Sequence, residues 1–94
     1  MSRPALPDGL ASYRRIGPFD PQTLPAGLRA EHRLKPDVWA LLIVRRGSLR
    51  FVWDDGRADR VETLVAGDEI AVPPEVLHHV EADGDFEIEI DFHR

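Results

Sequence analysis

Four histidines and no cysteine set the metal and acid–base chemistry open to this 94-residue chain. Because thiols are absent, disulfides, iron–sulfur clusters and cysteine nucleophiles are excluded, and a metal would need nitrogen and oxygen ligands. His78 shares a strand face with Val76 and Val80, and His32 lies on the apolar face of its own predicted strand, so both should point inward. Two inward imidazoles either find hydrogen-bond partners in the core or share a metal ion, and both interpretations stay open here.

The other histidines and the tryptophans are weaker candidates for chemistry. His79 follows His78 and must point the opposite way, so we expect it at the surface, together with His93 beside the last residue. Trp39 and Trp53 are expected to pack in the core or in an interface rather than to form a stacking platform for a ligand.

Three arginines near a glycine, Arg45, Arg46 and Arg50, offer charge for an anionic ligand, but a solvated strand face is the stronger expectation. The three serines lie outside any Gly-x-Ser-x-Gly motif, so a serine hydrolase is not expected. The sequence also lacks a glycine-rich loop of the kind that cradles phosphate groups.

The overall charge excludes another class of function. Twelve basic and seventeen acidic side chains give a net charge of −5, whereas proteins that bind the nucleic acid backbone carry a basic stripe. The longest apolar run, residues 38–44, is far shorter than the roughly twenty residues of a membrane-spanning helix. No apolar signal segment precedes Arg14. We therefore expect no nucleic acid partner, no membrane partner and a cytoplasmic location.

Turn residues divide the chain into short segments in which apolar and polar side chains alternate. This pattern, with no sustained helical period, predicts an all-β sandwich or barrel. The length fits one domain, residues 1–94, with a loose arm over residues 1–12 and an extended segment to residue 26. Turns are expected at residues 46–47 and 83–85, among others. The expected strands are 28–35, 38–45, 48–53, 60–65, 69–72, 77–81 and 86–92.

One segment resembles a known sequence motif. Gly67, Pro73 and His78 have the spacing of the second motif of the cupin superfamily. Two positions depart from that motif, because Glu75 stands in place of its glycine and Ala82 in place of its final asparagine.

The first cupin motif is matched more weakly. Gly27 and His32 lie near its opening glycine and histidine, with a spacing that is one residue short, and Gly47 fits its closing turn. Leu34 stands in place of the motif's second histidine, and Ala40 in place of its glutamate.

A closer resemblance is to the TehB/YeaR-like small cupins, a family linked by name to tellurite resistance. It covers residues 10–93, and its most specific parts are residues 19–32 and the corner from Pro73 to His78. The resemblance implies a single-domain cupin double-stranded β-barrel, jelly-roll-like with an extended N-terminal arm, that forms a homodimer. It also implies a divalent metal (Zn, Fe, Ni or Mn) in the mouth of the barrel, and it implies no established reaction.

Carried over to this chain, the resemblance makes His32, His78 and Asp91 the candidate metal ligands, a two-histidine, one-carboxylate set. The alternation along residues 86–92 argues against Asp91 as a ligand. If Phe86 and the apolar residues at every second position after it face the core, Asp91 faces solvent. If the apolar face of this strand instead packs on the arm or on a second copy, Asp91 turns inward. Both orientations stay open.

Three functions are compatible with these residues. The favoured one is a metal-binding cupin that holds a small molecule or an oxyanion in its barrel. The second is a metal-dependent enzyme, a dioxygenase or an isomerase, and the third is a non-catalytic dimeric scaffold with structural histidines. Whether the chain is an enzyme is left open.

Overall fold

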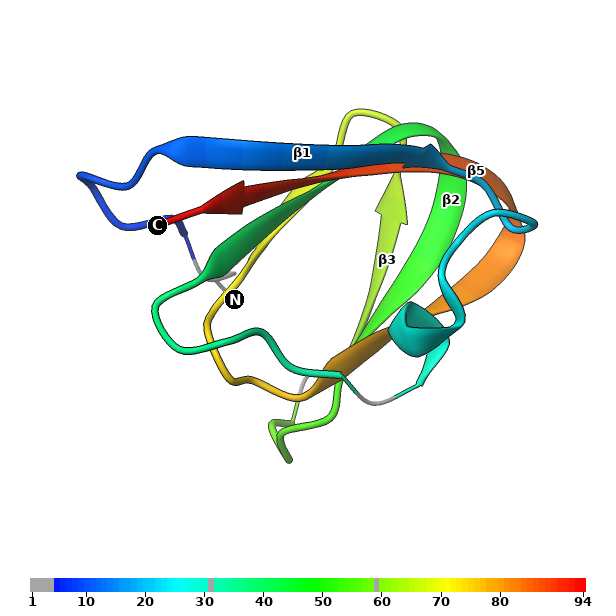
Figure 1. The fold of residues 1–94 in the computed structure, drawn as a ribbon. Helices are drawn as coiled ribbons and strands as arrows, with labels where there is room; N and C mark the ends of the chain where they lie inside the picture. The colour runs from blue at the N-terminus through cyan, green and yellow to red at the C-terminus, as the bar shows by residue number, and fades with distance from the viewer. Residues whose placement is uncertain (1–4, 31, 59) are drawn as a thin grey trace.

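The computed structural model describes residues 5–30, 32–58 and 60–94. Their regular structure consists of strands and one short 3-10 helix, so the expected all-β fold is confirmed. None of the described helices is long and apolar enough to cross a membrane. Figure 1 shows the strands curled around a common interior. The elements are β1 (Ser12–Phe19), η1 (Ala26–Arg29), β2 (Trp39–Trp53), β3 (Val61–Val65), β4 (Glu69–Val72) and β5 (His78–His93).

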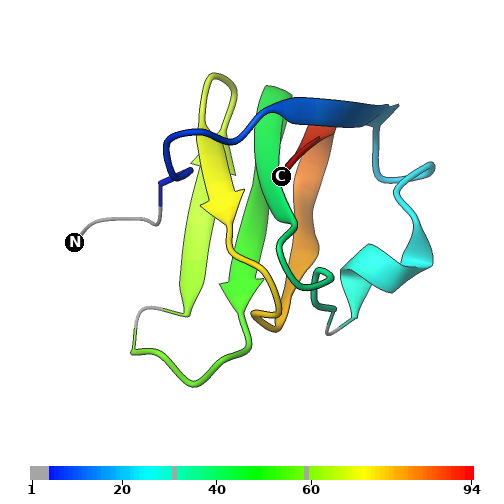
Figure 2. The ribbon, with the colours of Figure 1, turned by 60° about the vertical axis from the view of Figure 1, so that its left-hand side comes forward.

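The strands form one antiparallel sheet in the order β1–β5–β2–β3, with β4 also paired to β2. The first half of β2 lies between β4 and the second half of β5, and its second half lies between β3 and the first half of β5. Two halves of the sheet are thus joined by two long strands, and β1 lies across the top of the view in Figure 2. Among the described residues no pairing joins β3 back to β1, so the pairings show a curled sheet and do not show the closed barrel.

Gly47 lies where β2 bends from one half of the sheet to the other. Its φ is +75°, and a Cβ atom there would collide with the carbonyl oxygen of Asp85 in β5, so only glycine fits. The register between β2 and β5 shifts on both sides of Gly47, which accommodates the bend.

Several expected boundaries are wrong. The chain does not reverse at residues 46–47 or 83–85, because β2 and β5 continue through these positions as strands of 15 and 16 residues. Within the expected strand 28–35, the described residues 28–30 and 32–35 are not a strand but the end of η1 followed by a single β-bridge from His32 to His78. The arm expected over residues 1–12 ends one residue early, since β1 begins at Ser12.

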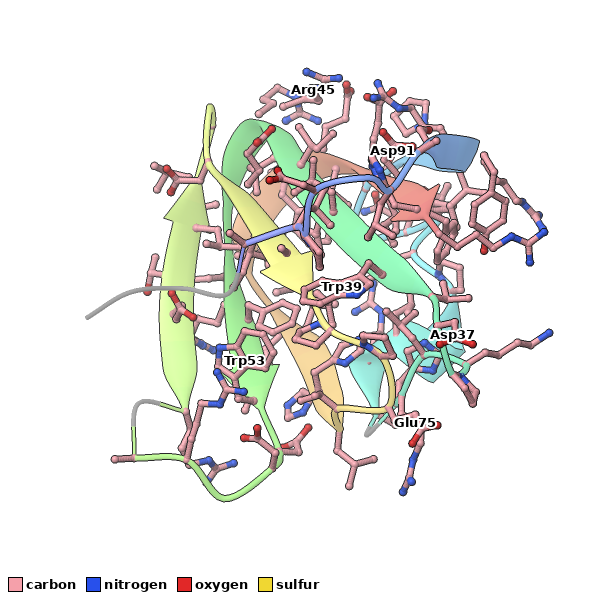
Figure 3. All side chains as sticks on the ribbon, turned by 90° about the vertical axis from the view of Figure 1, so that its left-hand side faces the viewer. Asp37, Trp39, Arg45, Trp53, Glu75 and Asp91 are labelled. Atoms are coloured by element: carbon pink, nitrogen blue, oxygen red, sulfur yellow. The ribbon has the colours of Figure 1, made fainter. Side chains whose placement is uncertain are left out.

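The core lies on the inner face of the curled sheet. The alternation expected along β5 is confirmed, because Phe86, Ile88 and Ile90 are each at most 6% exposed. The outer face of β2 is also covered in part, as Ile43 is 7% exposed, whereas Arg45 is exposed. Figure 3 shows Trp53 between the strands, whereas Arg45 projects away from the sheet. The buried cluster comprises Leu24, Leu34, Ala40, Leu42, Val44, Leu49, Phe51, Trp53, Leu64, Ile70, Val72, Val80, Phe86, Ile88 and Ile90.

Candidate functional site

His32 and His78 lie side by side on the inner face. The backbone N–H of each donates to the carbonyl oxygen of the other, with both N–O distances at 2.8 Å. Their imidazole rings meet edge to face, with centroids 5.2 Å apart. Both side chains line the same cavity, so the expectation that the two histidines point inward is confirmed.

The surroundings of His78 fix its protonation state. The residue is 6% exposed, and its ring stacks on Phe51 with centroids 5.4 Å apart. Burial lowers the pKa of His78 below its ordinary value, so the ring is neutral at neutral pH. Nδ1 lies 2.8 Å from the carbonyl oxygen of Val76, which can only accept a hydrogen bond, so Nδ1 carries the proton. Nε2 therefore keeps a lone pair that can accept a hydrogen bond or bind a metal ion.

The cavity beside the two histidines is small and apolar. Its volume is about 60 Å³, and, except for the two imidazoles, every described side chain that lines it is apolar, Leu42, Val72 and Ile90 among them. A cavity of this size holds a few water-sized groups. It is therefore suited to a small apolar group, with one polar atom directed at an imidazole.

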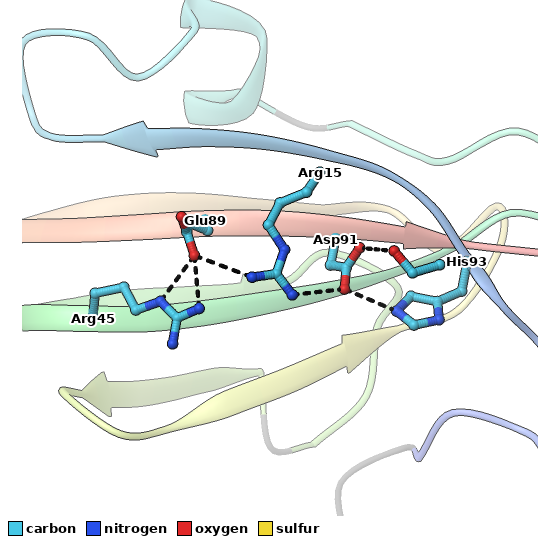
Figure 4. A network of polar contacts seen from close by, with 6 residues as sticks. Arg15, Arg45, Glu89, Asp91 and His93 are labelled. Carbon is cyan, nitrogen blue, oxygen red and sulfur yellow. Dashed lines mark hydrogen bonds and ion pairs between the residues drawn. The ribbon is translucent and has the colours of Figure 1, made fainter.

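Asp91 lies on the opposite face of β5 from this cavity, in the network of Figure 4. It is 5% exposed, so it is neither solvated nor turned toward the histidines. Ser12 Oγ donates to its Oδ1, and Arg15 Nη2 donates to its Oδ2 at 3.0 Å. Arg15 also contacts Glu89, which Arg45 binds at 2.7 Å. Burial opposes ionisation of Asp91, but the hydrogen bonds from Ser12 and Arg15 outweigh it and lower the pKa of this carboxyl.

The structure brings together two of the three candidate metal ligands. No group of three or more histidine, aspartate or glutamate side chains converges on one point in residues 5–30, 32–58 and 60–94. The two-histidine, one-carboxylate set with Asp91 therefore does not fit the described residues. One contact of His78 is typical of a ligating histidine, because such histidines commonly donate their second N–H to a carbonyl oxygen.

The expectation that His79 and His93 are surface side chains is wrong. His79 is 16% exposed and lies between two carboxylates, with Nδ1 at 2.6 Å from Asp54 and Nε2 at 2.9 Å from Glu81. Burial opposes protonation, but these two carboxylates outweigh it and raise the pKa of His79. His93 is 14% exposed, and its Nε2 lies 3.4 Å from Asp91 without a hydrogen bond within the described part of the chain.

The expectation that Trp53 packs in the core is confirmed. It has no exposed surface, its Nε1 donates to Glu62 Oε2 at 2.7 Å, and the Arg57 guanidinium lies 3.9 Å above the ring. Trp39 is half-buried at the start of β2.

The arginines near Gly47 lie on an exposed strand face, as expected, and they form ion pairs there. Arg46 pairs with Asp85 at 2.5 Å, and Arg50 pairs with Glu81 at 3.3 Å. Their charge is thus engaged by carboxylates of β5.

Glu75 accounts for one departure from the cupin motif. Its φ is +62°, which lies in the left-handed region that glycine adopts most easily, and the motif has a glycine at this position. Its N–H donates to the carbonyl oxygen of Leu34 at 3.1 Å, which ties the corner before His78 to the segment after His32. Asp37 has a φ of +67°, and the two side chains lie at the same end of the molecule in Figure 3.

The sequence does not reveal a basic groove beside His32. Arg14, Arg33 and Lys35 line this groove together with Tyr13. The alternation around residue 34 places Arg33 and Lys35 outside, but Arg14 comes from β1 and only the fold brings it to them.

Comparison with known proteins gives one family and several similar structures. The model of the TehB-like domain family matches residues 14–90. No curated protein matches the chain significantly. A protein from Escherichia coli strain K12 superposes with a TM-score of 0.85 at 31% identity, over 96% of this chain and 95% of that one.

Two further structures extend the comparison. TehB from Haemophilus influenzae gives a TM-score of 0.82 at 26% identity, over 92% of this chain and 32% of that one. The chain therefore spans about a third of the length of that protein. A cupin-2 domain containing protein from Shewanella frigidimarina gives a TM-score of 0.54 at 26% identity, over 67% of this chain and 60% of that one. The relation to cupins is thus a partial one.

Proposed function

The chain belongs to the TehB-like domain family, and from this premise we propose that it is a small-molecule-binding module whose ligand lies beside His32 and His78. The observation that supports the proposal is the cavity itself, in which apolar walls meet one acceptor of fixed tautomer, Nε2 of His78. Ligand sites commonly combine apolar walls with a few polar groups that fix orientation. A ligand with a small apolar part and one hydrogen-bond donor fits this arrangement.

An NMR titration of the full chain with 1,3-butanediol, which has two hydroxyl donors and a short alkyl chain, tests this proposal. We expect saturable shifts of the methyl resonances of Leu42 and Ile90 and of the His78 ring. Ala40 lines the cavity, so Ala40→Val fills part of it with two methyl groups and should abolish the shifts. Ala66→Val makes the same change in an exposed turn and should leave them intact.

Two outcomes would contradict the proposal. Shifts that fail to saturate would mean that the probe does not occupy a site, and shifts that persist in Ala40→Val would place the probe elsewhere. If Ala40→Val does not fold, Val72→Ile fills the same cavity with a single methylene and replaces it in the comparison.

A divalent metal held by His32 and His78 is a second candidate, supported by the neutral ring of His78 and its carbonyl-bound Nδ1–H. When bound, zinc, iron, nickel or manganese would polarise an oxygen of the ligand as a Lewis acid. We favour the form without metal because apolar walls compensate poorly for the lost hydration of a cation. Metal analysis of the purified chain tests this candidate. Near-equimolar metal that is lost in His78→Phe and kept in Asp91→Asn would favour the metal site over the site without metal.

We propose binding rather than catalysis for this site. Among the described lining residues only the two imidazoles offer acid–base groups, so a dioxygenase or isomerase reaction would depend on them and on the metal. An oxyanion ligand, to which the tellurite association in the family's name points, fits this cavity less well, because apolar walls do not replace the hydration of an anion.

We also propose that the chain forms a homodimer in the cytoplasm. The apolar face of residues 86–92 lies in the core and therefore does not supply a dimer surface. The exposure of Val61 and Val65, at 53% and 47%, on the end strand β3 supports the dimer. Light scattering at a chain concentration on the order of tens of micromolar should give twice the chain mass of 10.6 kDa. The mass of a single chain would contradict the dimer.

A further inference from the structure

An open groove beside His32 concentrates positive charge in an acidic chain. It has a volume of about 300 Å³ and is lined by Tyr13, Arg14, His32, Arg33 and Lys35, among others. None of its described lining residues is a carboxylate, although the chain as a whole carries a net charge of −5. We call this groove the basic vestibule.

The three cations of the basic vestibule are available to a ligand. Arg14, Arg33 and Lys35 are exposed, and within residues 5–30, 32–58 and 60–94 they form no ion pair. Arg45 and Arg46, by contrast, are engaged by carboxylates. A cluster of cations without partners creates a positive potential that attracts anions.

The basic vestibule adjoins the apolar cavity. His32, Leu34 and Phe92 line both spaces, whereas His78 lines only the cavity. His32 therefore marks the boundary between them. A molecule that occupies both spaces would lie against the cations of the vestibule at one end and against the His78 ring at the other.

We propose that the ligand of this site is a short-chain hydroxy acid, an inference that rests on the small-molecule function proposed above. Its carboxylate binds between Arg14, Arg33 and Lys35, its hydroxyl donates to Nε2 of His78, and its alkyl part fills the cavity. An engineered cavity of about 150 Å³ in another protein holds benzene. A cavity of about 60 Å³ limits the buried part to a few carbons and excludes a ring.

The test compares 3-hydroxybutyrate with its neutral counterpart 1,3-butanediol in NMR titrations of the full chain. Both carry a hydroxyl donor and a short alkyl chain, and only the first carries a carboxylate. We expect 3-hydroxybutyrate to bind about tenfold more tightly at low salt, an advantage that sodium chloride at roughly 0.5 M should largely remove.

Two double variants locate the charge effect. Arg33→Gln with Lys35→Gln should remove the roughly tenfold advantage of the anion and leave the affinity for 1,3-butanediol unchanged. Arg46→Gln with Arg50→Gln changes the net charge by the same amount on the exposed strand face and should leave both affinities unchanged. An equal loss in the two double variants would overturn the proposal, since the effect would then come from net charge alone.

The outcomes separate this inference from the proposed function. If 1,3-butanediol binds and 3-hydroxybutyrate binds no more tightly, the inference falls and the small-molecule function stands. If neither perturbs the cavity resonances, both fall. If inorganic phosphate binds as tightly as 3-hydroxybutyrate and Ala40→Val weakens neither, the vestibule is a surface anion site and the inference is overturned.

Discussion

Asp91→Asn tests the placement of Asp91 on the outer face. The substitution keeps the shape of the side chain and removes its negative charge. The carboxylate oxygens of Asp91 accept hydrogen bonds from Ser12 and, at 3.0 Å, from Arg15. Hydrogen bonds to charged groups contribute about 1.5–3 kcal/mol, and the low end applies because Arg15 is 47% exposed and screened by solvent. A loss of about 1.5 kcal/mol in a domain of this size lowers the Tm by about 6–12 °C.

The loss should depend on pH in a defined direction. The pKa of Asp91 is lowered in the folded chain, so its contribution to stability is complete above the ordinary carboxyl pKa of about 4. That contribution is lost as the pH falls through the lowered folded pKa. The difference in Tm between wild type and Asp91→Asn should therefore be constant from about pH 8 to 5 and shrink below about pH 4.

Thermal and urea unfolding, followed by circular dichroism, measure this loss. Asp83→Asn is the control, because Asp83 pairs with Arg50 at 3.5 Å with both side chains nearly half exposed, and it should cost less than about 0.5 kcal/mol. The same variants are titrated with 1,3-butanediol and analysed for bound metal. Unchanged stability of Asp91→Asn, combined with lost ligand or metal binding, would refute the outer-face role and restore the three-ligand site.

Three further substitutions probe the fold. Gly47→Ala should cost more than about 3 kcal/mol or prevent folding, because its Cβ would collide with the carbonyl oxygen of Asp85, and the urea midpoint checks this; a normal midpoint would be inconsistent with the bend. Glu75→Gly should raise the Tm in calorimetry, since a left-handed φ of +62° costs a non-glycine residue about 1 kcal/mol, and a lower Tm would argue against strain there. His79→Gln should lower the free energy of unfolding more at about pH 5.5 than at about pH 9. The pKa of His79 is raised in the folded chain, so the protonated ring stabilises the fold fully below the ordinary pKa near 6.5. This stabilisation is lost as the pH rises through the raised pKa of the folded chain. Equal losses of stability at the two pH values would contradict that assignment.

The strands could be predicted wherever one face is buried and the other is not. Ile88 and Ile90 alternate with charged side chains, and that period of two is the same in the sequence and in the structure. The bend at Gly47 could not be predicted in this way. A glycine with positive φ serves a tight turn or a bent strand equally well, and only the pairing of β2 with β5 decides between them.

The site could be predicted in part for a similar reason. The inward direction of His32 and His78 was predicted correctly from the apolar residues two positions away, although His32 lies in a single β-bridge and not in a strand. The structure places the two rings together. The alternation along β5 also predicted that Asp91 lies on the face opposite the core. It could not predict that Ser12 and Arg15 cover that face. Their contacts come from β1, which is distant in the chain and adjacent only in the sheet.

The basic vestibule shows the same limit of local pattern. Arg33 and Lys35 read as an ordinary solvated strand face, because most exposed charges in a small domain are solvated. Only the fold brings Arg14 of β1 to the groove that Arg33 and Lys35 also line, and the three cations together make this groove basic.

The most direct test of the central claim is the long-range proton–nitrogen NMR spectrum of the histidine rings, recorded while 1,3-butanediol is added. In the free chain, we predict a protonated Nδ1 and an unprotonated Nε2 for His78. On titration the Nε2 resonance of His78 should shift in a saturable way, and the ring of His93 on the outer face should not respond. A protonated Nε2 in the free chain, or a His78 ring that ignores the probe, would contradict the claim that this cavity is the binding site.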